Sequence, residues 1–164
     1  MSAGQYRQAN GPAGEGSVSA ATVAPDGPRP PPYDDRMWIV TLPRQQITAF
    51  ASSGVAMDFL PRITDAERAH VQIAHLAAGG TLGEHPAGMR QVFAVLSGHG
   101  EVSADGGSRR PISAGQAALW EPGEVHQTWA TSDMVVVIVE TAGRLEPDEL
   151  FVEVRATREG PATD

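Results

Sequence analysis

Apolar residues in this chain fall into short runs, many of which alternate with polar residues. This pattern, rich in Val, Ile, Phe and Trp, is typical of strands rather than helices. Gly, Pro and Asp separate the runs, and no long segment has a helical period. We expect strands at 37–42, 46–50, 55–60, 70–76, 91–96, 99–104, 109–112, 117–120, 125–130 and 134–140, with an edge strand at 149–155. The sequence thus predicts an all-β sandwich or barrel built mainly from antiparallel strands.

The two ends of the chain differ from this pattern. Residues 1–35 are rich in Gly, Ala, Ser and Pro and finish in a proline cluster at 28–32. Such a segment cannot bury enough apolar surface to offset the entropy of ordering it. We therefore predict a disordered arm at 1–35, one folded domain at 36–156 and a frayed tail at 157–164.

Composition narrows the classes of partner and chemistry. A chain of 164 residues with 41% apolar residues suffices for one core. Its net charge of −8 argues against nucleic acid and against anionic membrane surfaces. Without cysteine there is no disulfide, thiolate metal site or cysteine nucleophile. No signal-peptide pattern or membrane-length apolar run stands out, so we expect a cytoplasmic protein.

Two glycine-bounded segments carry the residues best suited to a functional site. The first runs from Gly79 to Gly98 and contains His85 and Gln91, and the second runs from Gly115 to His126. Each brings one histidine next to a predicted strand. Because alternate residues of a strand share a face, we expect Gln91 and Phe93 to share one face, and His126 and Thr128 another.

These segments resemble the two motifs of the cupin family. In the first motif, Gly79 matches the opening glycine, His85 the first histidine and Gly98 the closing glycine. The second histidine of that motif falls on Ala87, and Gln91 stands where glutamate is usual. The resemblance covers about residues 71–141.

The second motif is matched by Gly115, Gly123 and His126 with the family's spacing. The proline is displaced by one place to Pro122, and Ala130 replaces the asparagine. The resemblance implies a double-stranded β-helix, or jelly-roll barrel, whose interior is lined by the faces that carry Gln91 and His126.

In the family, three histidines and a glutamate bind one divalent metal. The resemblance therefore implies that His85, Gln91 and His126 are the candidate ligands for Fe, Mn, Ni, Zn or Cu. A glutamine offers only a neutral carbonyl oxygen, which is a poorer ligand for these ions than a carboxylate. Its amide suits hydrogen bonding to an organic molecule instead.

For other side chains near the histidines, both a functional and a purely structural role are considered. Phe93, Trp120 and Thr128 are candidate substrate-binding residues, although core packing is the stronger default for aromatic residues on strands. Glu84 and Glu124 flank the histidines and are candidates to supply the missing negative charge, but we expect them to be solvated loop carboxylates, which are more common. The remaining histidines, His70, His75 and His99, are expected at the surface or in sheet packing.

Three functions remain open on the sequence. The first is a cupin that binds a small organic molecule in its barrel through His85, Gln91 and His126. The second is a metal-dependent cupin enzyme of dioxygenase or isomerase type with the same residues. The third is a structural or regulatory homodimer. No catalytic residue is assigned, and whether the chain is an enzyme stays open.

Overall fold

The computed structural model describes residues 37–155. The arm predicted at 1–35 and the tail predicted at 157–164 lie outside these described residues. Within them, strands dominate and one short 3-10 turn, Ala49–Ala51, is present. The prediction of an all-β fold is confirmed.

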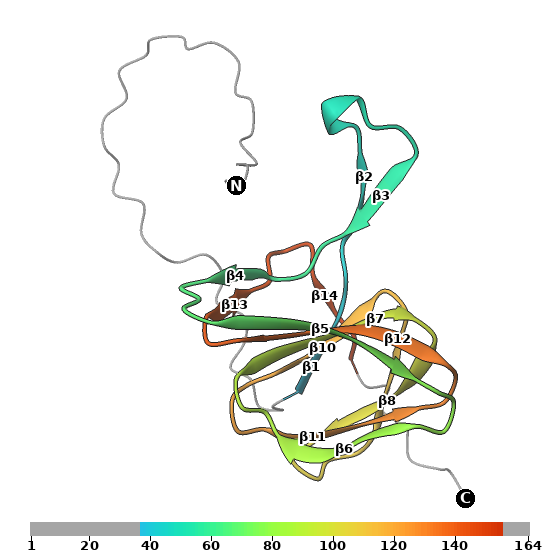
Figure 1. The fold of residues 1–164 in the computed structure, drawn as a ribbon, viewed down its shortest axis with the longest axis vertical. Coiled ribbons are helices and arrows are strands. Elements are labelled where there is room, and N and C mark those ends of the chain that lie inside the picture. The colour runs from blue at the N-terminus through green and yellow to red at the C-terminus, as the bar shows by residue number, and fades with distance from the viewer. Residues whose placement is uncertain (1–36, 156–164) are drawn as a thin grey trace, which may run out of the picture. The chain divides into compact units, whose positions relative to one another are not determined.

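Two antiparallel sheets face each other and form the barrel (Figure 1). The larger sheet has six strands in the spatial order β14 (Val152–Glu153), β1 (Met37–Thr41), β10 (Gln116–Trp120), β7 (Arg90–Ser97), β12 (Met134–Thr141) and β5 (Ala69–Leu76). The smaller sheet has four strands in the order β6 (Thr81–Pro86), β11 (Val125–Ala130), β8 (His99–Ala104) and β9 (Arg110–Ser113). This is the double-sheet jelly-roll arrangement that the sequence predicts.

The main core lies between the two sheets. Strand β12 shows how it forms: Met134, Val136 and Ile138 point inward and belong to the buried cluster between the sheets. They meet Val102 and Ile112 from the smaller sheet. Alternate positions, such as Val139, face the outer side of the larger sheet, where a second buried cluster forms. Because both faces are covered, β12 is apolar almost throughout rather than alternating.

Two small hairpins flank the barrel. Strands β4 (Arg62–Thr64) and β13 (Arg144–Glu146) pair with each other, and their Ile63 and Leu145 pack on the outer cluster of the larger sheet. Strands β2 (Arg44–Ile47) and β3 (Val55–Asp58) form the other hairpin, whose residues are mostly exposed. The strand expected at 46–50 lies instead at Arg44–Ile47, because the chain turns at Ala49–Ala51, where Phe50 has a φ of 58°.

Gly98 marks a point where the backbone of one turn touches another. Its φ is +80°, and a Cβ built on it would lie 2.1 Å from the carbonyl oxygen of Asp133. Only glycine fits both the conformation and the space. The closing glycine of the first sequence segment therefore fixes the turn between β7 and β8 against the start of β12.

Candidate functional site

His85 and His126 lie directly opposite each other at one end of the barrel. His85 is on β6 and His126 on β11, and the two residues are cross-strand partners. Their ring centroids are 4.4 Å apart. The His126 residue is only 3% exposed, whereas His85 is exposed. The structure thus brings together the two histidines singled out in the sequence, with His85 on the solvent side.

Both rings are held in the same way by the backbone. His85 Nδ1 lies 2.7 Å from the carbonyl oxygen of Gly83, and His126 Nδ1 lies 3.2 Å from that of Glu124. A carbonyl only accepts hydrogen bonds, so Nδ1 of each neutral ring carries the proton. Nε2 is then the unprotonated nitrogen, with its lone pair available.

His126 Nε2 is buried and has no hydrogen-bond partner among the described residues. Buried polar atoms without a partner are rare, and each one calls for an explanation such as a bound molecule. The same holds for Trp120 Nε1, a donor that is buried and has no partner within residues 37–155. One acceptor and one donor therefore lie unsatisfied on neighbouring rings.

Trp120 forms the apolar wall of the site. Its indole stacks on the His126 ring at 4.3 Å between centroids and an interplanar angle of 20°. Phe93 packs against Trp120 edge to face at 5.9 Å. Both aromatic residues are at most 1% exposed. The structure places Phe93 and Trp120 in the core, and of these two Trp120 is the one that contacts a site histidine.

A row of polar residues crosses the inward face of the larger sheet. Gln91 on β7 pairs with Glu140 on β12, and Glu140 pairs with His70 on β5. Gln91 shares its face with Phe93 of the main core and is 4% exposed. Glu140 is half-buried and close enough to His126 to act on its charge. Gln91, Glu140 and the two facing histidines therefore belong to the same end of the barrel.

Burial lowers the pKa of His126 below its ordinary value, and the nearby His85 lowers it further. The Glu124 carbonyl and the charge of Glu140 act in the opposite direction but do not outweigh burial. Desolvation disfavours the charged imidazolium, so the ring stays neutral at pH 7. A neutral ring with a free Nε2 is a hydrogen-bond acceptor.

The remaining predicted residues occupy different surroundings. Thr128 is 1% exposed on β11 and packs inside the barrel. Glu84 is exposed, as expected. The expectation that Glu124 is solvated is wrong, because the residue is 4% exposed and its carboxylate accepts a hydrogen bond from the Glu121 amide. The tight turn between β10 and β11 directs the Glu124 side chain back toward the Glu121 amide, which buries it.

The donor set is incomplete for a divalent transition metal. The two imidazoles present free Nε2 atoms, which is the form that binds metals. However, among residues 37–155 no group of three His, Asp or Glu side chains is placed to hold an ion. The third candidate, Gln91, is a neutral amide, and these metals bind best where a carboxylate or further imidazole completes the set. The residues present fit an organic ligand better than a metal.

Residues 72–141 match the family model described as the cupin domain. The matched stretch, residues 72–141, is a cupin domain. The matched stretch contains both glycine-bounded segments, both site histidines, Gln91 and Glu140. The family resemblance drawn from the sequence is thereby confirmed.

Solved structures similar to parts of this chain include the following three. A cupin superfamily protein from Desulfitobacterium hafniense has a TM-score of 0.44 and 10% identity, over 48% of this chain and 71% of its own. A conserved double-stranded β-helix protein from Klebsiella pneumoniae has a TM-score of 0.44 and 21% identity, over 57% and 77%. A cupin 2 conserved barrel protein from Salinispora arenicola has a TM-score of 0.41 and 26% identity, over 49% and 68%.

Two further findings are negative. No functionally curated protein matches the chain. Within residues 37–155, no helix has the length and apolar character needed to cross a membrane.

Sequence reasoning did not single out Glu140. The signal was present in the run from Met134 to Glu140, where alternate positions hold Met134, Val136, Ile138 and Glu140. A charged residue at the end of a core-facing series lies on the inward face. Its closeness to His126, however, depends on how the two sheets face each other, which no local pattern specifies.

Proposed function

We propose that this cupin domain binds a small organic molecule at the His85–His126 end of the barrel. The observation that carries the proposal is the buried Nε2 of His126, an acceptor without a partner among the described residues. Leaving such an atom unpaired costs about 1–3 kcal/mol. A ligand that donates a hydrogen bond to this nitrogen recovers that cost.

The surroundings of His126 favour a ring-bearing ligand with a hydroxyl group. The hydroxyl proton would be donated to His126 Nε2, and the hydroxyl oxygen would remain free to accept from a donor such as the Gln91 amide. Aromatic side chains next to His126 favour an apolar ring, because offset and edge contacts between rings are attractive. Phenols are the simplest class with both features.

Solvent access to the site is available from one side. His70 and Gln72 share the inward face of β5 with Leu76, yet both are exposed. His85 on β6 is exposed as well. In the proposal, a ligand enters between these strand ends and the exposed His85 ring turns aside to admit it.

Calorimetric titration with phenol and with anisole tests this proposal. The two molecules share the ring and the oxygen, but anisole has a methyl group in place of the hydroxyl proton. Phenol is expected to bind at least about tenfold more tightly, because a site built around one hydrogen bond discriminates against the analogue lacking it. His126→Phe should remove the difference. Equal binding of both probes would contradict the proposal.

A homodimer is the assembly that we propose for this domain. Strand β5 is the edge of the larger sheet, so one side of its backbone has no neighbouring strand in the described chain. Its outward face carries Val71 and Ile73, which are 68% and 63% exposed. Exposed apolar edge strands promote association with another strand edge. A second copy would cover this strip with the same residues by twofold symmetry.

A further inference from the structure

A cavity of about 450 Å³ is lined mainly by residues of the outer face of the larger sheet and by the turn between β10 and β11. Trp38 on β1 and Leu119 on β10 form its floor; they are cross-strand partners on the outward face of the larger sheet. Leu145 on β13 and the following Pro147 form one wall. The volume and the mainly apolar lining are those of a small-molecule site.

The opposite wall of the cavity is the turn between β10 and β11. Its two charged residues, Glu121 and Glu124, both line the cavity and both carry carboxylates. The side chain of Glu121 is 64% exposed. The cavity therefore joins an aromatic and aliphatic floor to a rim with two carboxylates, of which Glu121 is paired with Arg90 and Glu124 is buried.

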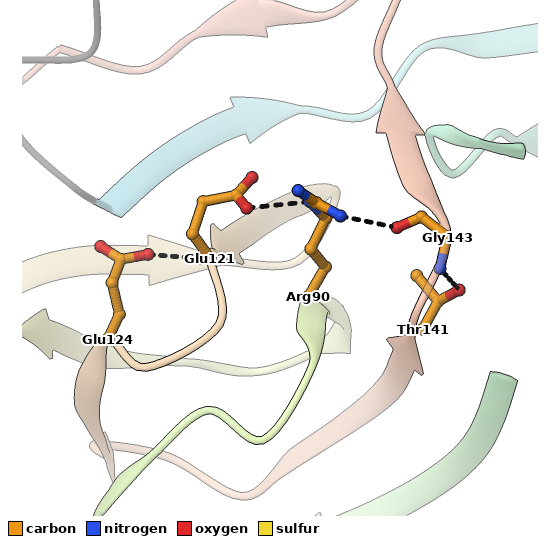
Figure 2. A network of polar contacts seen from close by, with 5 residues as sticks. All are labelled: Arg90, Glu121, Glu124, Thr141 and Gly143. Carbon is orange, nitrogen blue, oxygen red and sulfur yellow. Dashed lines mark hydrogen bonds and ion pairs between the residues drawn. The ribbon is translucent and has the colours of Figure 1, made fainter. Parts of the chain in front are cut away.

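Arg90 ties the two walls together (Figure 2). Its Nε lies 2.8 Å from a carboxylate oxygen of Glu121, and its NH1 donates to the carbonyl of Gly143 at 3.1 Å. The Gly143 amide in turn donates to the Thr141 hydroxyl at 2.9 Å. Gly143 directly precedes β13, so one arginine fixes the spacing between the Glu121 wall and the Leu145 wall. A cavity whose walls are held apart in this way is preformed.

We infer that this outer cavity is a second binding site, which takes a ring-bearing apolar amine. The ring would lie on Trp38 and Leu119, where indole faces attract both apolar rings and nearby cations. The ammonium group would lie toward Glu121 at the rim. Two carboxylates against one guanidinium leave an excess of negative groups at the rim, so a carboxylate on the same ring would be disfavoured there. Trp120 and Glu124, which contact His126, line this cavity as well, but the inference does not rest on the function proposed above.

Nuclear magnetic resonance of the full chain tests the site, because the tryptophan indoles provide separate reporters. Trp38 lies in the cavity, whereas the Trp129 ring packs beneath Arg109, 3.8 Å from its guanidinium carbon. Addition of 1-naphthylmethylamine is expected to shift the Trp38 indole signal and leave that of Trp129 unchanged. The matching acid, 1-naphthylacetate, is expected to bind at least about tenfold more weakly.

Two variants with matched controls complete the experiment. Leu145→Trp fills the cavity and should abolish binding, whereas Leu96→Trp, at a position 52% exposed on β7, should not. Glu121→Gln, at an exposed position, should bring the affinities of amine and acid together, whereas Glu101→Gln, which also loses an arginine partner, should not.

Three outcomes would overturn the inference. They are no Trp38 shift at millimolar amine, equal affinity for amine and acid, and undiminished binding by a folded Leu145→Trp variant. Because the full chain is used, the first outcome counts against the inference whatever prevents the amine from binding. If Leu145→Trp does not fold, the Glu121→Gln comparison decides.

Discussion

The indole of Trp120 stacks on the imidazole of His126, with 4.3 Å between ring centroids and 20° between the planes. This contact joins the larger sheet, which carries Trp120, to the smaller sheet, which carries His126. It also removes water from one face of the imidazole. The acceptor nitrogen of His126 is thus buried by the same packing that closes the barrel.

The free energy of unfolding should depend on pH through His126. Burial holds the folded-state pKa of His126 below the value of about 6.5 in the unfolded chain. Between these two pKa values the unfolded chain binds more protons, so stability rises with pH. The contribution is complete above about pH 6.5 and is lost as the pH falls through the folded-state pKa. Urea unfolding at several pH values measures this slope.

The His126→Phe variant isolates that contribution. Phenylalanine keeps a ring against Trp120 but does not titrate, so the stability of this variant should fall less between pH 7 and pH 5 than that of the natural protein. An identical slope in His126→Phe and the natural protein would show that His126 is not the titrating group.

Glycines of the two sequence segments should differ in their tolerance of alanine. Gly98 and Gly115 both have a positive φ, +80° and +84°, which costs an L-residue about 1–2 kcal/mol. Of these two glycines, only Gly98 has an atom in the way of a Cβ, the Asp133 carbonyl oxygen. Gly98→Ala should therefore lower the free energy of unfolding by about 1–3 kcal/mol more than Gly115→Ala, because its Cβ is forced into occupied space. Equal losses in urea unfolding would contradict the close approach.

Much of the fold was predictable because most strands are marked by a local sequence pattern. Runs such as 91–96 and 134–140 are apolar, β-branched and bounded by turns, so their extended state follows from local patterns. The exposed hairpin of β2 and β3 was foreseen only approximately. Its residues pack on little else, so no core-facing period marks where the strands end.

The site was predictable only in part. Motif spacing identified His85 and His126, and strand parity placed Gln91 on the inward face. Two features escaped, namely the approach of Glu140 to His126 and the burial of Glu124. The first depends on a contact between two different strands and the second on the path of a turn, and neither is encoded in spacing along one strand.

Replacing Gln91 with a carboxylate should change the metal affinity of the site. Gln91→Glu adds an anionic oxygen to the two imidazoles, so we expect Co²⁺ or Zn²⁺ to bind at least about tenfold more tightly than to the natural protein. Absorption spectra of the Co²⁺ form and calorimetry provide the measurement. Glu84→Gln, at an exposed position, is the control. If the natural protein itself held one equivalent of Co²⁺ or Zn²⁺ tightly, the conclusion that its side chains do not suffice to bind a metal would be wrong.

The proposed homodimer should depend on the outward face of β5. Ile73→Arg introduces a charge into the apolar strip and is expected to shift the solution mass from dimer to monomer at micromolar concentration. Leu150→Arg changes another residue, 49% exposed, away from that strip and should leave the mass unchanged. A natural protein that remains monomeric at all concentrations would rule out the homodimer.

Nitrogen-15 spectra of the His126 ring test the central claim most directly. The account predicts a neutral ring at pH 7 with the proton on Nδ1, and an Nε2 signal that moves toward that of a hydrogen-bonded acceptor when phenol, but not anisole, is added. A proton on Nε2, or phenol binding that leaves the Nε2 signal of His126 unmoved, would contradict it.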